Sequence, residues 1–180
     1  LWESWVKEIW LQLGGKFAGP QGGQVIKGTT PASTLALYTH FGQPVSELIR
    51  QVNKWSSNVM ARHLELAVAG TPEAFNRQML DWLRSQGIGV NDWVFENGSG
   101  LSRTTQIDAK GLSEFLASRA TRADFPDFLA SFPRAGADGT LHRRVNGVDG
   151  FAYMKTGSLN GVRSLGGYLR DRQGQLWAAG

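Results

Sequence analysis

Three short stretches of the sequence carry residue types that could act together on a substrate. The first is Lys155-Thr156-Gly157, in which a cation and a hydroxyl precede a glycine. On a strand that borders a cleft, the lysine and the threonine could both reach a bound carboxylate, and the glycine would let a substrate backbone approach closely. The following N–H, on Ser158, would then be free to polarise a carbonyl group. The simpler alternative is an edge-strand lysine that guards against aggregation.

The second stretch is Ser56-Ser57-Asn58, which we predict at the start of a helix. There, Ser56 and Asn58 could face a cleft while the body of the helix packs. Considered alone, ordinary helix capping is the simpler explanation, and a chance Ser-x-Asn occurs in about half of chains of this size.

The third stretch, Ser4-Trp5-Val6-Lys7, has the spacing of a serine nucleophile with a lysine base one helical turn away. On the predicted helix, however, Ser4 and Lys7 fall on the polar face, opposite an apolar stripe that we expect to be buried. A solvated lysine is protonated at neutral pH and cannot accept the serine proton. We therefore interpret this match as a solvated helix face.

Hydrophobic periodicity and capping residues predict the elements that must position these stretches. Helices are expected at residues 1–13, 44–52, 54–69, 71–87, 108–120 and 124–132. Strands are expected at residues 34–38, 93–95, 150–155, 162–170 and 175–179. Short glycine-containing turns join the last three strands, which favours an antiparallel meander. The order predicts an α/β protein of the α+β kind, with helices packed on an antiparallel sheet.

The bulk composition bounds the class of protein. With 180 residues, 41% hydrophobic and 19% charged, the chain fits one globular domain or most of one. The absence of cysteine excludes disulfides, thiolate metal sites and a cysteine nucleophile. The histidines have no metal-ligand spacing, and no apolar run is long enough to span a membrane. The net charge of +4 is scattered, so nucleic-acid binding is the least favoured reading.

Together, Ser-x-Asn and a distant Lys-Thr-Gly resemble the motifs of the penicillin-recognising serine enzymes. Four stretches in order resemble the DacB, or penicillin-binding protein 4, type of D-alanyl-D-alanine carboxypeptidase/endopeptidase in peptidase family S13: LIRQVNKWSSNVMARHL, ENGSGLSR, AGADGTLHRR and KTGSLNGVRSLGGYL. The resemblance implies a β-lactamase/transpeptidase-like fold, incomplete here, with residues 1–180 as the C-terminal part of a single penicillin-binding domain. The nucleophile motif of this family lies upstream, so Ser4 is not its counterpart.

The resemblance also implies a role for each matching residue. Ser56 would relay a proton toward the leaving amine, and Asn58 would hydrogen-bond the substrate amide. Lys155 would place positive charge near this relay and near the substrate's terminal carboxylate, which Thr156 would bind. The backbone N–H of Ser158 would form half of an oxyanion hole.

The implied reaction is acyl transfer to a serine followed by hydrolysis, which releases D-alanine or cleaves a crosslink. The implied partners are peptidoglycan stem peptides ending in D-Ala-D-Ala, with β-lactams as inhibitors. No metal, cofactor, nucleic acid or transmembrane segment is expected, and the implied location is the periplasm. Because the nucleophile motif is missing, we expect this piece to be inactive by itself.

Two further readings stay open at this point. A class A β-lactamase would add a deacylating glutamate, for which Glu96 is the nearest candidate. A non-catalytic module that binds peptidoglycan or β-lactams would show no covalent labelling by a penicillin.

Overall fold

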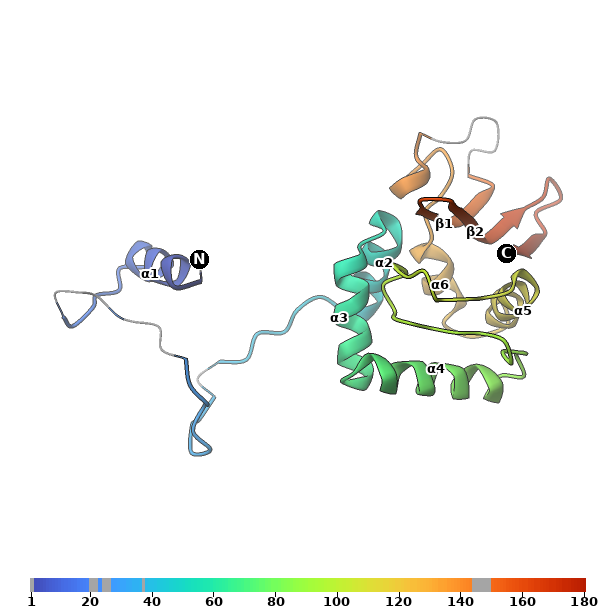
Figure 1. Ribbon diagram of the computed structural model, residues 1–180. Helices are drawn as coiled ribbons and strands as arrows, with labels where there is room; N and C mark the ends of the chain where they lie inside the picture. Colours follow the sequence, from blue (N-terminus) through green and yellow to red (C-terminus); the bar gives the residue numbers. More distant parts are fainter. Residues whose placement is uncertain (1, 20–22, 24–26, 37, 144–149) are drawn as a thin grey trace. The chain divides into compact units, whose positions relative to one another are not determined.

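The computed structural model describes residues 2–19, 23, 27–36, 38–143 and 150–180 (Figure 1). The chain divides into two compact units, residues 1–41 and 42–180. Among the described helices, none combines the length and the apolar character that a membrane crossing requires.

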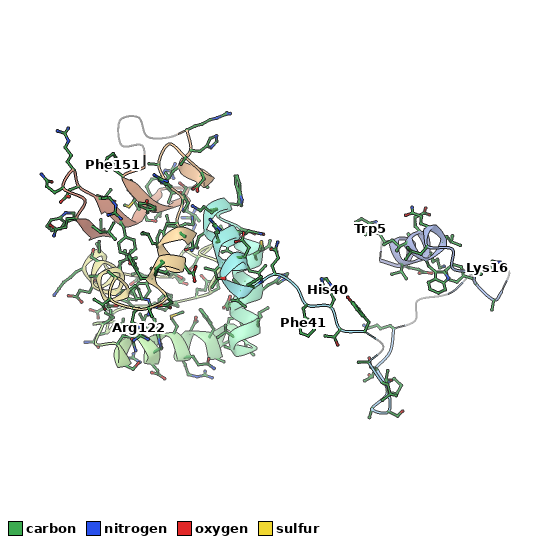
Figure 2. The ribbon with its side chains drawn as sticks, turned by 180° about the vertical axis from the view of Figure 1, so that it is seen from behind. Trp5, Lys16, His40, Phe41, Arg122 and Phe151 are labelled. Atoms are coloured by element: carbon green, nitrogen blue, oxygen red, sulfur yellow. The ribbon has the colours of Figure 1, made fainter. Side chains whose placement is uncertain are left out.

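The described part of the first unit contains one helix, α1 (Trp2–Gln12), as the apolar periodicity predicts. Its apolar side chains are not buried as expected. Val6 is 44% exposed and Leu13 is 80% exposed, and Trp5 projects from the helix in Figure 2. The strand expected at residues 34–38 is wrong for the described residues 34–36 and 38. The described residues of this unit contain no partner strand to pair with them, and a lone strand leaves its backbone unpaired.

The second unit begins with two consecutive helices, α2 (Val45–Trp55) and α3 (Asn58–Ala69). The sequence places the start of the second helix at residue 54, which is four residues too early. Ser56 ends α2 by adopting a left-handed backbone with φ of 55°, and its N–H donates to Val52 O. Ser57 then caps α3 by accepting the Met60 N–H at 3.4 Å. The two helices are therefore separated by a sharp break at Ser56.

Three further helices follow as expected: α4 (Pro72–Ser85), α5 (Ala109–Arg119) and α6 (Phe125–Ser131). The predicted caps form, since Thr71 accepts the Ala74 N–H at 3.2 Å and Asp108 accepts the Gly111 N–H at 2.7 Å. A short 3₁₀ helix, η1 (Gly139–Leu141), precedes the sheet. Figure 1 shows the sheet at one end of this unit and α4 at the opposite end.

The sheet is the predicted antiparallel meander, in the order β1 (Ala152–Leu159), β2 (Val162–Arg170), β3 (Leu176–Ala179). The first strand is longer than the predicted 150–155, so that the whole Lys-Thr-Gly stretch lies inside β1. The strand expected at 93–95 is reduced to one bridge, between Val94 and Gln106.

Tyr168 fixes the sheet to the helices below it. Its side chain packs with Leu116 and Phe132, and its hydroxyl donates to Leu116 O at 2.6 Å. Burial raises the pKa of Tyr168 to about 12, so the phenol remains a neutral donor at physiological pH. Since α5 packs against β2 and β3, and α2 packs against α6, the sheet and the break at Ser56 belong to one packed body.

Candidate active site

A cavity of about 670 Å³ opens in the second unit. Its lining contains all six residues to which the family resemblance assigns a place in the site: Ser56, Asn58, Lys155, Thr156, Gly157 and Ser158. Its apolar wall comes from α5, α6 and the residue after α6: Leu112, Phe115, Leu116, Phe128 and Phe132. The structure thus brings the two distant motifs to one hollow surface.

Ser56 and Lys155 are in direct contact within this cavity. The Lys155 amine donates to the Ser56 hydroxyl at 2.7 Å and to Thr156 O at 2.7 Å. Ser56 is also the one non-glycine residue with a positive φ in the described part of the chain. A left-handed backbone costs a serine about 1 kcal/mol or more, and such outliers persist where the surroundings hold them. The break between α2 and α3 therefore directs the Ser56 hydroxyl at Lys155.

The electrostatic state of Lys155 suits a binding role. Burial lowers the pKa of its amine below the ordinary value of 10.5, because the charged form loses water. Among the ion pairs of the described residues, none involves Lys155. Its positive charge is therefore available to an anionic group that enters the cavity.

Within the described residues, no strand pairs with the outer edge of β1 next to Lys155. The beginning of this edge is covered, where the Met154 N–H donates to Pro133 O at 2.9 Å. Because hydrogen-bonded pairs alternate along an antiparallel ladder, the N–H groups of Thr156 and Ser158 point the same way as that of Met154, away from β2. An extended peptide could add to this edge with its carbonyl oxygens facing those groups.

A loop that the sequence analysis did not assign to the site forms another wall. Asn97 is buried and holds this loop closed: its Oδ1 accepts the Ser99 N–H at 3.0 Å, and its Nδ2 donates to Leu101 O at 3.2 Å. Gly98, Ser99 and Leu101 line the cavity. The turn-rich stretch ENGSGLSR signals a loop, but nothing in it shows that Asn97 holds the loop that forms a cavity wall.

Two other sequence candidates stand apart from this chemistry. Lys7 lies on α1, where its amine pairs with a Glu3 carboxylate oxygen at 2.7 Å, and Ser4 is exposed. Glu96 is exposed and accepts hydrogen bonds from Ser102 at 2.5 Å and Thr104 at 2.8 Å, which lower its pKa. Glu96 does not line the cavity that holds Lys155.

Comparisons with known proteins agree with the motifs. The model of the D-Ala-D-Ala carboxypeptidase 3 (S13) family matches residues 4–179. The chain is 31% identical over 181 residues to D-alanyl-D-alanine carboxypeptidase DacB of Haemophilus influenzae, which covers 94% of this chain and 36% of that protein. It is 33% identical over 147 residues to carboxypeptidase DacB of Mycolicibacterium smegmatis, covering 74% of this chain and 32% of that one.

The fold agrees as well. The crystal structure of penicillin binding protein 4 (dacB) from Haemophilus influenzae, complexed with a β-lactam, matches with a TM-score of 0.80 and 27% identity, over 97% of this chain and 42% of that chain. This match confirms the predicted transpeptidase-like fold. The chain spans about a third of the length of the curated relatives named above. By the extent of the family match, it belongs to the D-Ala-D-Ala carboxypeptidase 3 (S13) family.

Proposed function

We propose that this chain supplies the substrate-binding half of a serine-type D-Ala-D-Ala carboxypeptidase/endopeptidase that acts on peptidoglycan peptides. The observation that carries the proposal is the contact between Lys155 and Ser56 at 2.7 Å, beside the free edge of β1 and inside one cavity. A cation, a hydroxyl and outward-pointing backbone N–H groups lie together there, which supports binding of a peptide that ends in a carboxylate.

The substrate lies along β1 in this mechanism. Its terminal carboxylate meets the Lys155 amine and the Thr156 hydroxyl, while Gly157 leaves room for its backbone. The Asn58 side-chain amide, on the first residue of α3, holds the substrate amide from the other side of the cavity. The N–H of Ser158, at the open edge, points to where the carbonyl oxygen becomes negative in the transition state.

Ser56 then relays a proton to the leaving group. When a serine oxygen attacks the scissile carbonyl carbon, the amide C–N bond breaks and the leaving D-alanine nitrogen needs a proton. The Ser56 hydroxyl donates that proton and takes up the one that the attacking serine hydroxyl releases, so that no net charge is gained or lost. The charged Lys155 amine, which donates to the Ser56 oxygen, holds the relay in place and keeps its own proton. Water then hydrolyses the acyl-enzyme and regenerates the serine.

We propose that the attacking serine comes from a further segment. The Ser-x-x-Lys at residues 4–7 is a poor candidate, because Lys7 is already paired with Glu3 and Ser4 is exposed. The chain alone would then bind the substrate without being acylated. Since the family match runs from residue 4 to 179, we also propose that both units belong to a single penicillin-binding domain.

The proposed partners are stem peptides ending in D-Ala-D-Ala and β-lactams, and the proposed location is the periplasm. The Haemophilus influenzae relative, whose structure was solved with a β-lactam, supports the second class of ligand. A β-lactamase is less well supported, because Glu96 turns to Ser102 and Thr104 and does not face the cavity.

The test combines intact-mass spectrometry with NMR titration of the ¹⁵N-labelled chain. Incubation with penicillin should leave the mass unchanged, and a peptide ending in D-Ala-D-Ala should shift the amide signals of Ser56, Asn58 and Ser158. The same peptide ending in L-Ala-L-Ala should not. Equal shifts by both peptides, or none by either, would refute the substrate assignment. A penicillin adduct mapped to Ser4 would refute the external nucleophile.

A further inference from the structure

Lys54, two residues before Ser56, is an almost buried cation with a complete set of partners. Its side chain is 12% exposed. Its amine donates to Phe132 O at 2.6 Å and to both carboxylate oxygens of Asp138, at 2.8 and 2.6 Å. The last turn of α2 is thereby tied to a segment eighty-four positions further along the chain.

The segment on the other side of this ion pair is itself well fixed. Asp138 Oδ1 also accepts the Arg134 N–H at 2.8 Å, which closes the turn. Gly139 has a φ of 56°, and a Cβ built on it would lie 2.5 Å from Lys54 O. Backbone therefore packs directly on backbone at this point, and only a glycine fits.

Ser56 depends on the same turn of α2. Its left-handed φ of 55° is unfavourable for a serine, so contacts outside Ser56-Ser57-Asn58 must hold this backbone conformation. The N–H groups of Ser56 and Ser57 both donate to Val52 O, which lies on the turn that Lys54 anchors. If that turn loosened, these two hydrogen bonds and the direction of the Ser56 hydroxyl would be lost together.

We propose that Lys54 and Asp138 are positioning residues that hold Ser56 in its left-handed conformation and so place its hydroxyl against Lys155. The ion pair acts through the backbone of α2 and does not touch the substrate. This inference rests on the proposed function for the meaning of the Ser56 hydroxyl, but its structural claim can be measured without turnover. It also assigns a structural role to the AGADGT turn at residues 135–140, because that turn supplies both Asp138 and Gly139.

A neighbouring contact makes it possible to test whether the Lys54–Asp138 pair has a specific effect or whether any anchor of α2 would serve. Asn53, one residue earlier, donates to Ser131 Oγ at 2.9 Å and ties the same turn to α6. It makes no link to the turn at 134–139 among the contacts of the described residues. Replacing Asn53 therefore removes an anchor of similar kind while leaving the Lys54–Asp138 pair intact.

The experiment uses amide hydrogen exchange and NOE spectroscopy on the full chain. In Lys54→Met, exchange of the Ser56 and Ser57 amides should accelerate by about tenfold or more, because the local opening is no longer opposed by the ion pair. The NOE between the Lys155 ε-protons and the Ser56 β-protons should disappear. Exchange in α5 and β2 should stay within about twofold of the unchanged chain, since those elements keep their packing.

Asp138→Asn keeps the shape of the side chain and should reproduce the local change if Lys54→Met does not fold. Lys54→Arg retains the charge and should recover part of the protection. Lys110→Met, at an exposed ion pair, and Asn53→Ala should leave the NOE in place. An NOE and Ser56 protection that survive both Lys54→Met and Asp138→Asn would overturn the proposal. Failure of the unchanged chain to bind the D-Ala-D-Ala peptide would refute only the proposed function, because exchange and NOE are read without ligand.

Discussion

The Lys155 amine lies 2.7 Å from the Ser56 hydroxyl, although ninety-nine positions separate the two residues in the chain. Two local features produce this contact. One is the left-handed backbone of Ser56, which turns its side chain out of the line of α2 and α3. The other is the position of Lys155 on the edge strand of the sheet, where its amine is partly buried and has no carboxylate partner among the described residues. The pair leaves one positive charge directed at an open cavity.

Lys155→Met should weaken binding of a peptide ending in D-Ala-D-Ala by about tenfold or more. The reason is that the terminal carboxylate loses its cationic partner, and charge-assisted contacts are the stronger ones in such a site. Titration of the ¹⁵N-labelled chain measures the dissociation constant. Lys110→Met removes a lysine from an exposed ion pair and serves as the matched control with unchanged affinity. Equal losses in the two variants would mean that net charge, and not Lys155, attracts the peptide.

The same affinity should depend on pH in a defined direction. Burial lowers the pKa of Lys155 below 10.5, while the peptide carboxylate stays ionised at neutral and alkaline pH. The charged amine binds the carboxylate, so affinity is retained below the pKa of Lys155 and falls above it, levelling off at the affinity expected of Lys155→Met. Titrations between neutral pH and the ordinary lysine range, with the Lys155 ε-carbon shift followed in parallel, should show both changes at the same pH. An affinity that stays constant up to pH 10.5 would contradict the assignment.

The sequence predicts the helix caps of this fold but not the break between α2 and α3, for physical reasons. The caps Thr71 and Asp108 are local, because each side-chain oxygen accepts from a backbone N–H only three residues further along, and both are confirmed. The break at Ser56 is not predicted, because serine gives no sign of a left-handed backbone that only tertiary contacts can maintain.

Contacts between residues far apart in the chain cannot be predicted from local sequence patterns. Lys54 and Asp138 are eighty-four positions apart and are unremarkable in sequence, yet they meet at 2.6 Å. The six site residues can be grouped from the sequence only through the resemblance to a family. Their spacing along the chain gives no sign that the two motifs meet. The apolar stripe of α1 shows the opposite failure: its periodicity predicts the helix correctly, but periodicity alone does not provide a surface that covers Val6 or Leu13.

Glu65→Met should stabilise the second unit. Glu65 is 1% exposed, and neither carboxylate oxygen has a hydrogen-bond partner in the part of the chain that the structure describes. A methionine of similar volume removes that desolvation cost, which should raise the free energy of unfolding by about 1–3 kcal/mol. Urea unfolding followed by circular dichroism measures the change. The matched control, Glu73→Met in the exposed first turn of α4, should lower stability slightly, because a carboxylate there favours the helix dipole. A loss of stability in Glu65→Met would show that the buried carboxylate has a partner or a role of its own.

Asp108→Asn should remove part of the acid sensitivity of the fold. The Gly111 N–H and the Trp93 indole N–H both donate to the Asp108 carboxylate, at 2.7 and 2.5 Å, and they lower its pKa below 3.8. A carboxylate whose folded pKa is depressed contributes stability above its unfolded pKa and loses it as pH falls through the folded value.

The stability difference between the unchanged chain and Asp108→Asn should therefore be greatest at neutral pH and shrink from about pH 4 downward. Thermal unfolding at a series of pH values measures it. Ser113→Ala, which removes a neutral hydroxyl from the same helix, should give a difference that does not vary with pH. A stability difference for Asp108→Asn that is equally independent of pH would show that Gly111 and Trp93 do not hold the carboxylate in its charged form. The first turn of α5 would then be stabilised by its packing against the sheet and not by its cap.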